Sequence, residues 1–212
     1  MTEALQTLEK IKGINASFPF TDPVKDWKAE GKKVLGYTCI NVPEELIHAA
    51  GILPFRVTGS QEESSLNQAD AIFYTSTCSF IRSCLELKLR GDYNFLDAYV
   101  GSTPCEGAMR LAEVGGRFHT IPLLYIMDVP RKINERSIAY YRNEIFEFKK
   151  RLEDSFGAKI SDGAIVDSIA LYNKTRTVFK KLSDLRKRDT PPLSGAEMME
   201  VLNAAVRMPR EE

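Results

Sequence analysis

The sequence predicts an α/β fold in which flanking helices cover a parallel sheet and long helices follow on the C-terminal side. Apolar, strand-like segments alternate with helical patterns over residues 33–127, and such alternation is typical of a parallel sheet. From residue 135 onward, two long amphipathic patterns rich in Lys, Arg and Glu replace the alternation. Because 43% of the 212 residues are hydrophobic, the chain has enough apolar side chains for a core.

The start of the chain leads into the first strand. Residues 1–30 are expected to form a helical or irregular lead-in, pinned to the body by the aromatic residues Phe18, Phe20 and Trp27. Residues 33–37 follow a turn at Gly31 and read as a buried strand.

A short helix and a second strand come next. Pro43 followed by two glutamates is a helix-start signal, and Gly51 ends the helix. Residues 52–57 are predicted to form a strand at the edge of the sheet, because Pro54 cannot donate to a central ladder.

The middle of the chain repeats the pattern. Residues 59–69 are expected to be a polar loop, and a weakly marked strand is expected at 71–74. Residues 79–90 have helical periodicity and end before Gly91, after which residues 96–101 read as a strand.

The last α/β repeat precedes the long helices. Residues 102–104 restart a helix that Gly115-Gly116 breaks, and residues 120–127 read as a strand. The remaining expected elements are helices at 135–156, 162–187 and 195–206, with a linker at Pro191-Pro192.

The charge balance excludes several classes of function. The 29 basic and 29 acidic side chains cancel, which argues against a general nucleic-acid or membrane-surface binder. No apolar run reaches the length of a membrane span. The polar start lacks the apolar core of a secretion signal, so we expect a cytoplasmic protein.

Four cysteines require an explanation. Since thiols stay reduced in the cytosol, metal binding or redox chemistry is the functional interpretation, and burial as small hydrophobic side chains is the structural one. Cys39, Cys78 and Cys105 are each expected between a strand and the next helix, at the sheet edge where α/β proteins bind ligands. Cys84 falls on an apolar helix face and is interpreted as core, although it stays a possible ligand if the loop at Cys78 curls back.

The cysteine pattern favours an iron–sulfur cluster over zinc. A helix N-terminus stabilises a thiolate, which suits metal ligation by Cys78 and Cys105. The chain has no CxxC or HExxH pattern, and thiolates without histidine leave an iron–sulfur cluster as the candidate. P-loop, GxGxxG and GxSxG motifs are also absent.

Three other side chains are candidates for chemistry. Glu45 is either an acidic residue that favours the helix start or a proton-transfer group. His48, one turn further along, is either a partly buried residue whose ring nitrogens are hydrogen-bonded or a catalyst. Arg82, near Cys78, is either a substrate-binding cation for an anionic ligand or a solvated helix charge.

Several segments together resemble the benzoyl-CoA reductase / 2-hydroxyacyl-CoA dehydratase family. The resemblance runs in order over about residues 30–207. The segments that carry it are 31–37 (GKKVLGY), 42–51 (VPEELIHAAG), 78–85 (CSFIRSCL), 102–106 (STPCE), 128–130 (DVP), 171–176 (LYNKTR) and 191–195 (PPLSG).

The resemblance implies a fold, a cofactor and partners. Subunits of this family have Rossmann-like α/β domains, pair as homo- or heterodimers, and hold an oxygen-sensitive [4Fe-4S] cluster through cysteines, commonly three. Cys78 and Cys105 match two of these positions. A separate ATP-hydrolysing activator protein supplies single electrons, and an acyl-CoA thioester is reduced to a ketyl radical that loses water, or an aromatic ring is reduced. Glu45 and His48 fall on a matching segment and are expected to handle protons near the substrate.

The resemblance also divides the chain and reveals one departure. The expected parts are the lead-in at 1–30, an α/β cluster-binding domain at 31–134 and a helical segment at 135–212 that leads towards a second domain. In the family that second α/β half supplies the third cysteine. We therefore expect a truncated, split or short subunit, with completion of the site by Cys84 or Cys39 as the alternative.

Two other functions remain open at this point. One is an ATP-dependent reductase of small molecules from the same lineage, which would need more cysteines. The other is a cluster-free scaffold or assembly module that retains the fold.

Overall fold

The computed structural model describes residues 3–60, 65–117 and 121–212. In them, a parallel sheet has the strand order β2-β1-β3-β4, which confirms the predicted α/β fold. The strands are β1 (Val34–Tyr37), β2 (Leu53–Arg56), β3 (Ala98–Ser102) and β4 (Leu123–Met127). Leu35 of β1 lies opposite Pro54 on one side and Ala98 on the other. β2 is an edge strand, as Pro54 indicates.

The sheet is buried on both faces because alternate side chains of each strand point to opposite sides. Val34 packs in one core with Phe55 and Tyr99. Its neighbour Leu35 packs in a second core with Val100. A sheet that is apolar on both faces requires helices on both faces.

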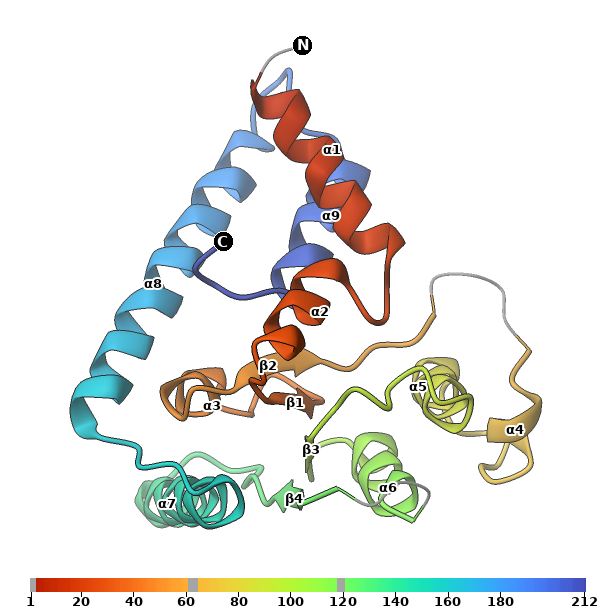
Figure 1. The fold of residues 1–212 in the computed structure, drawn as a ribbon, viewed down its shortest axis with the longest axis vertical. Helices are drawn as coiled ribbons and strands as arrows, with labels where there is room; N and C mark the ends of the chain where they lie inside the picture. The colour runs from red at the N-terminus through yellow and green to blue at the C-terminus, as the bar shows by residue number, and fades with distance from the viewer. Residues whose placement is uncertain (1–2, 61–64, 118–120) are drawn as a thin grey trace.

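The helices meet this requirement in two pairs. The long helix α7 and the short helix α3 cover one face of the sheet, while α5 and α6 cover the other (Figure 1). The helices are α1 (Glu3–Ala16), α2 (Asp22–Ala29), α3 (Glu44–Ala49), α4 (Asn67–Asp70), α5 (Ser79–Leu89), α6 (Glu106–Gly115), α7 (Glu135–Phe156), α8 (Asp162–Leu185) and α9 (Gly195–Ala205). Among the described residues, no helix is both long and apolar enough to cross a membrane.

Helices from the two ends of the chain extend beyond β2 (Figure 1). α1 packs against α9, where the Asn15 amide donates to the Glu200 carbonyl at 2.8 Å, and α8 packs against α3. The Arg56 N–H on the edge strand donates to the Val206 carbonyl at 3.0 Å. The C-terminal helices therefore return to the N-terminal helix and to the sheet edge.

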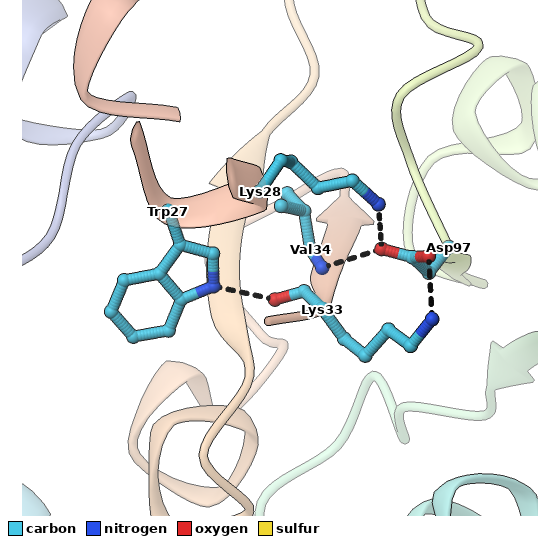
Figure 2. A network of polar contacts seen from close by, with 5 residues as sticks. All are labelled: Trp27, Lys28, Lys33, Val34 and Asp97. Carbon is cyan, nitrogen blue, oxygen red and sulfur yellow. Dashed lines mark hydrogen bonds and ion pairs between the residues drawn. The ribbon is translucent and has the colours of Figure 1, made fainter. Parts of the chain in front are cut away.

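A polar network ties α2 to the sheet, as Figure 2 shows. Asp97, just before β3, accepts from Lys28 Nζ at 2.7 Å and from the Val34 N–H at 2.9 Å. Its second oxygen lies 3.4 Å from Lys33 Nζ. The Trp27 indole N–H donates to the Lys33 carbonyl at 2.9 Å, so this aromatic residue pins the lead-in as expected. One carboxylate thus joins the lead-in to the starts of β1 and β3.

The structure differs from the sequence predictions around the polar loop. Residues 71–74 form turns and bends after α4, so the prediction of a strand there is wrong. The reason is local, because the Phe73 N–H donates to the Ala69 carbonyl at 2.7 Å and is not free for a ladder. The helix expected from residue 102 begins at Glu106, since Ser102 still pairs with β4. Loop residues 61–64 and Thr120, the expected first residue of the last strand, lie outside the described residues.

Candidate metal centre

Cys78 and Cys105 line one cavity of about 720 Å³. Cys78 is the N-cap of α5, Cys105 is the N-cap of α6, and both are exposed. N-caps are normally Ser, Thr, Asp or Asn, whose side chains bond the first turn. Neither sulfur makes such a bond, so both are available for another ligand.

A glycine allows the two helix starts to approach each other. A Cβ added to Gly107, in the first turn of α6, would lie 3.1 Å from the Ile81 side chain of α5. Ile81 is buried in the core and has little space to move. The absence of a side chain at Gly107 therefore brings the α6 start, with Cys105, close to the α5 start, with Cys78.

The rest of the cavity combines apolar and charged groups. Ile72, Phe73, Tyr74 and Thr77 come from the loop before α5, whereas Arg110 comes from α6. Sequence reasoning missed this arginine, whose only signal is its position just over one turn beyond the Cys105 cap. Its guanidinium pairs with Glu113 at 2.8 Å and lies 3.8 Å from the carboxylate of Glu106, which also lines the cavity.

Cys39 follows β1 but is not one of the residues lining that cavity. Its φ is +77°, an uncommon value for a residue with a side chain. Partial burial raises the pKa of its thiol, but neighbouring hydrogen-bond donors, chiefly the Asn41 backbone, lower it by more, and the net pKa is below the ordinary value. Cys39 is thus a thiolate-prone residue in a separate environment.

Cys84 lies in the core, with 1% of its surface exposed, as its place on the apolar helix face indicates. Burial raises the pKa of its thiol to about 12. A thiol that is both inaccessible and protonated is a poor ligand and a poor nucleophile.

Glu45 and His48 lie on α3 and do not line the cavity. Glu45 forms an ion pair with Arg176 of α8. His48 Nδ1 lies 2.7 Å from Ser168 Oγ, and its Nε2 lies 2.8 Å from a Glu211 oxygen. Both side chains are therefore engaged between α3, α8 and the C-terminal residues, and the structure does not bring them to the cysteines.

Arg82 also has partners within the chain. Its guanidinium donates to Asp70 at 2.6 Å and to the Thr77 carbonyl at 3.1 Å. It is not one of the residues lining the cavity.

The cysteine pair fits part of a thiolate-ligated metal group. Within residues 3–60, 65–117 and 121–212, no group of three or more His, Cys, Asp or Glu side chains could hold a metal ion. Two thiols at one cavity supply part of a cluster's ligand set, and a complete set would need a ligand from elsewhere.

We expect the four thiols to differ sharply in reactivity. Iodoacetamide should modify Cys78 and Cys105 readily in the folded protein, while Cys84 reacts only after unfolding. A pKa raised from 9.0 to about 12 lowers the thiolate fraction of Cys84 by roughly a thousandfold, and burial blocks access as well. Mass spectrometry of peptides from timed reactions measures the four rates. Labelling of Cys84 as fast as Cys105 in folded protein would contradict the assignment.

Comparison with known proteins agrees with the resemblance seen in the sequence. The family "2-hydroxyglutaryl-CoA dehydratase, D-component" matches residues 39–212. One of the benzoyl-CoA reductase subunits of Thauera aromatica is 29% identical over 191 residues, which cover 89% of this chain and 50% of that protein. The beta subunit of lactoyl-CoA dehydratase from Anaerotignum propionicum is 32% identical over 157 residues, which cover 74% and 41%.

A third relative matches along nearly all of the chain. The beta subunit of (R)-2-hydroxyglutaryl-CoA dehydratase from Acidaminococcus fermentans is 28% identical over 212 residues, which cover 97% of this chain and 54% of that protein. The chain thus spans about half the length of the relatives it matches. Since the family match covers most of its residues, the chain belongs to the 2-hydroxyglutaryl-CoA dehydratase D-component family.

Proposed function

We propose that this chain is the iron–sulfur part of a subunit in a 2-hydroxyacyl-CoA dehydratase or benzoyl-CoA reductase. In this proposal Cys78 and Cys105 hold a [4Fe-4S] cluster that passes single electrons to a CoA thioester. The observation that carries it is that two exposed thiols, neither of which makes a helix-capping hydrogen bond, line the same cavity. Relatives named as subunits of benzoyl-CoA reductase and lactoyl-CoA dehydratase support the class of enzyme.

Further ligands are proposed to come from outside the described residues. The relatives are about twice as long as the matched segment, so a second half or a homologous partner subunit is the proposed source of the third thiolate. When bound, such a cluster supplies low-potential electrons and, at an iron without a protein thiolate, a Lewis acid.

The chain's own residues have three roles in this proposal. Cys78 and Cys105 bind iron as thiolates. Arg110 lies at the cavity wall and balances the negative charge of Glu106, which lines the same cavity beside the thiolates. Ile72 and Phe73 provide apolar surface that limits the access of water.

Glu45 and His48 are assigned no step in this proposal. Their partners lie on α8 and near the C-terminus, away from the cysteine cavity. Proton transfer near the substrate is therefore left to groups at the cavity or on the proposed second half.

The proposed partners follow from the class of enzyme. They are a homologous subunit, an ATP-hydrolysing activator protein that delivers electrons, and an acyl-CoA substrate. The choice between dehydration and ring reduction depends on the acyl group.

Anaerobic reconstitution tests the cluster directly. The full chain is incubated with ferrous iron, sulfide and an excess of a small thiol, which takes the iron positions that the proposed second half would ligate, and bound iron, bound sulfide and visible absorption are measured after desalting. We expect a brown protein from the wild type, and loss of most iron and colour in Cys78→Ala and Cys105→Ala. Cys39→Ala is the matched control and should retain both. Iron-free wild-type protein, or equal loading of all variants, would contradict the proposal.

A further inference from the structure

We propose that Arg82 is a positioning residue for the Cys78 thiol, acting through the loop that precedes it. This inference rests on the proposed function only in giving Cys78 the role of a metal ligand. The geometry that supports it concerns residues 68–78, α5 and the cavity that they share with Cys105.

The loop before Cys78 has no regular structure of its own. α4 ends at Asp70 and α5 begins at Ser79, and turns connect them. A segment without a ladder or a long helix keeps one conformation only if other contacts fix it. The Thr77 N–H donates to the Tyr74 carbonyl at 2.9 Å, which is a local turn and does not attach the loop to the rest of the fold.

Arg82 supplies attachments at both ends of this loop. Its Nη1 donates to Asp70 Oδ1 at 2.6 Å, where α4 ends. Its Nε donates to the Thr77 carbonyl at 3.1 Å, one residue before Cys78. The Arg82 side chain is largely buried and extends from the first turns of α5. It therefore holds the loop against the helix that Cys78 caps.

Glu86, one turn further along α5, adds a second attachment. This buried carboxylate accepts from the Ala69 N–H at 2.8 Å and lies 3.5 Å from the Gln68 amide nitrogen. Arg82 and Glu86 therefore bind α4 and the loop from neighbouring positions on one helix face. We call the four residues Asp70, Thr77, Arg82 and Glu86 the loop clamp.

The loop clamp shapes the wall that faces Cys105. Ile72, Phe73, Tyr74 and Thr77 all line the cavity, and all lie within the stretch that the clamp holds. Phe73 is buried in one of the two cores and keeps the middle of this wall in place. Loss of the clamp should therefore free the end of the loop at Thr77 and widen the range of Cys78 positions relative to Cys105, while both cores stay intact. Arginine suits the task because its planar fork reaches two acceptors in fixed directions, whereas lysine is a point charge.

The test measures how often the two thiols meet. Dibromobimane becomes fluorescent when it bridges two thiols, so the metal-free chain is treated with it and the Cys78–Cys105 product is verified by mass spectrometry. We expect the bridging rate to fall about tenfold in Arg82→Met, because two charge-assisted hydrogen bonds are lost. The bridging rate should fall less in Asp70→Asn, and in Arg82→Lys it should lie between the rates of Arg82→Met and the wild type.

Controls separate positioning from general damage. Arg90→Met, on an exposed arginine just after α5, should bridge like the wild type. Alkylation of Cys105 by iodoacetamide and the thermal unfolding midpoint should stay near wild-type values in Asp70→Asn, which keeps the assay informative if Arg82→Met folds poorly. Wild-type bridging rates in both Arg82→Met and Asp70→Asn would overturn the inference, as would the absence of a Cys78–Cys105 product in the wild type.

Iron loading distinguishes this inference from the proposed function. If the wild type takes up iron and Arg82→Met does so more slowly, both stand. If the wild type takes up no iron but bridging still depends on Arg82, the cluster proposal fails and the positioning role stands. If iron uptake is normal and the bridging rate is the same with and without Arg82, only the positioning role fails.

Discussion

Phe148→Ala is expected to destabilise the chain by about 4 kcal/mol, whereas Phe146→Ala, two residues earlier on α7, should change stability by less than about 0.5 kcal/mol. Phe148 is 0% exposed and its ring stacks on Tyr125 of β4 with centroids 5.5 Å apart. Phe146 is 62% exposed on the outer side of the same helix. Truncating the buried ring removes apolar contact and leaves a cavity, while truncating the exposed ring does neither.

Denaturation by urea, followed by circular dichroism, measures this difference. The matched pair controls for helix propensity, because both substitutions place alanine at interior positions of α7. Equal unfolding free energies for the two variants would mean that α7 does not belong to the sheet core.

Arg210→Met is expected to lose about 3 kcal/mol of unfolding free energy, whereas Arg176→Met should lose less than about 1 kcal/mol. Both arginines pair with adjacent glutamates at the start of α3, Arg210 with Glu44 and Arg176 with Glu45. The difference is burial, since the Arg210 side chain is 9% exposed and that of Arg176 is 56% exposed.

The surroundings of Arg210 explain the larger effect. Burial lowers the pKa of Arg210, but the nearby Glu44 carboxylate raises it by more, so the guanidinium stays charged. Its charge also lies 5.1 Å from the centre of the Tyr172 ring. Removing it would leave the Glu44 carboxylate unpaired beside the buried phenol of Tyr37.

Unfolding curves of the two arginine variants test this claim. A double variant, Glu44→Gln with Arg210→Met, should recover part of the loss, because it no longer buries an unpaired charge. A loss of similar size in Arg176→Met would show that exposure does not decide the strength of these pairs.

The alternating part of the fold could be predicted because its signals are local. Pro43, Gly51 and Pro54 mark a helix start, a helix end and an edge strand, and the structure has all three features. The turns at 71–74 could not be predicted in the same way. The Phe73 N–H bonds back to the Ala69 carbonyl, and the flanking residues Ala69 and Thr77 are bound by Glu86 and Arg82 of a helix that follows in sequence.

The cysteine-lined cavity was only partly predictable for the same reason. Helix-cap positions predict that Cys78 and Cys105 lie at the sheet edge. Because 26 residues separate them, however, the spacing does not predict that the two thiols line the same cavity. Their approach depends on the close contact between Gly107 and Ile81. The pairing of Glu45 with Arg176, across 131 positions, has no local signal at all.

The contact between α1 and α9 has a consequence for biosynthesis. Asn15 and Glu200, which join the two helices, are 185 positions apart. α1 therefore leaves the ribosome long before α9 is synthesised, and the face that carries Leu8 and Ile14 lacks this partner while the residues between them are made. Contacts between such distant segments form late and slowly. Until residues 195–205 are synthesised, α1 presents these apolar side chains without the helix that packs against them in the fold.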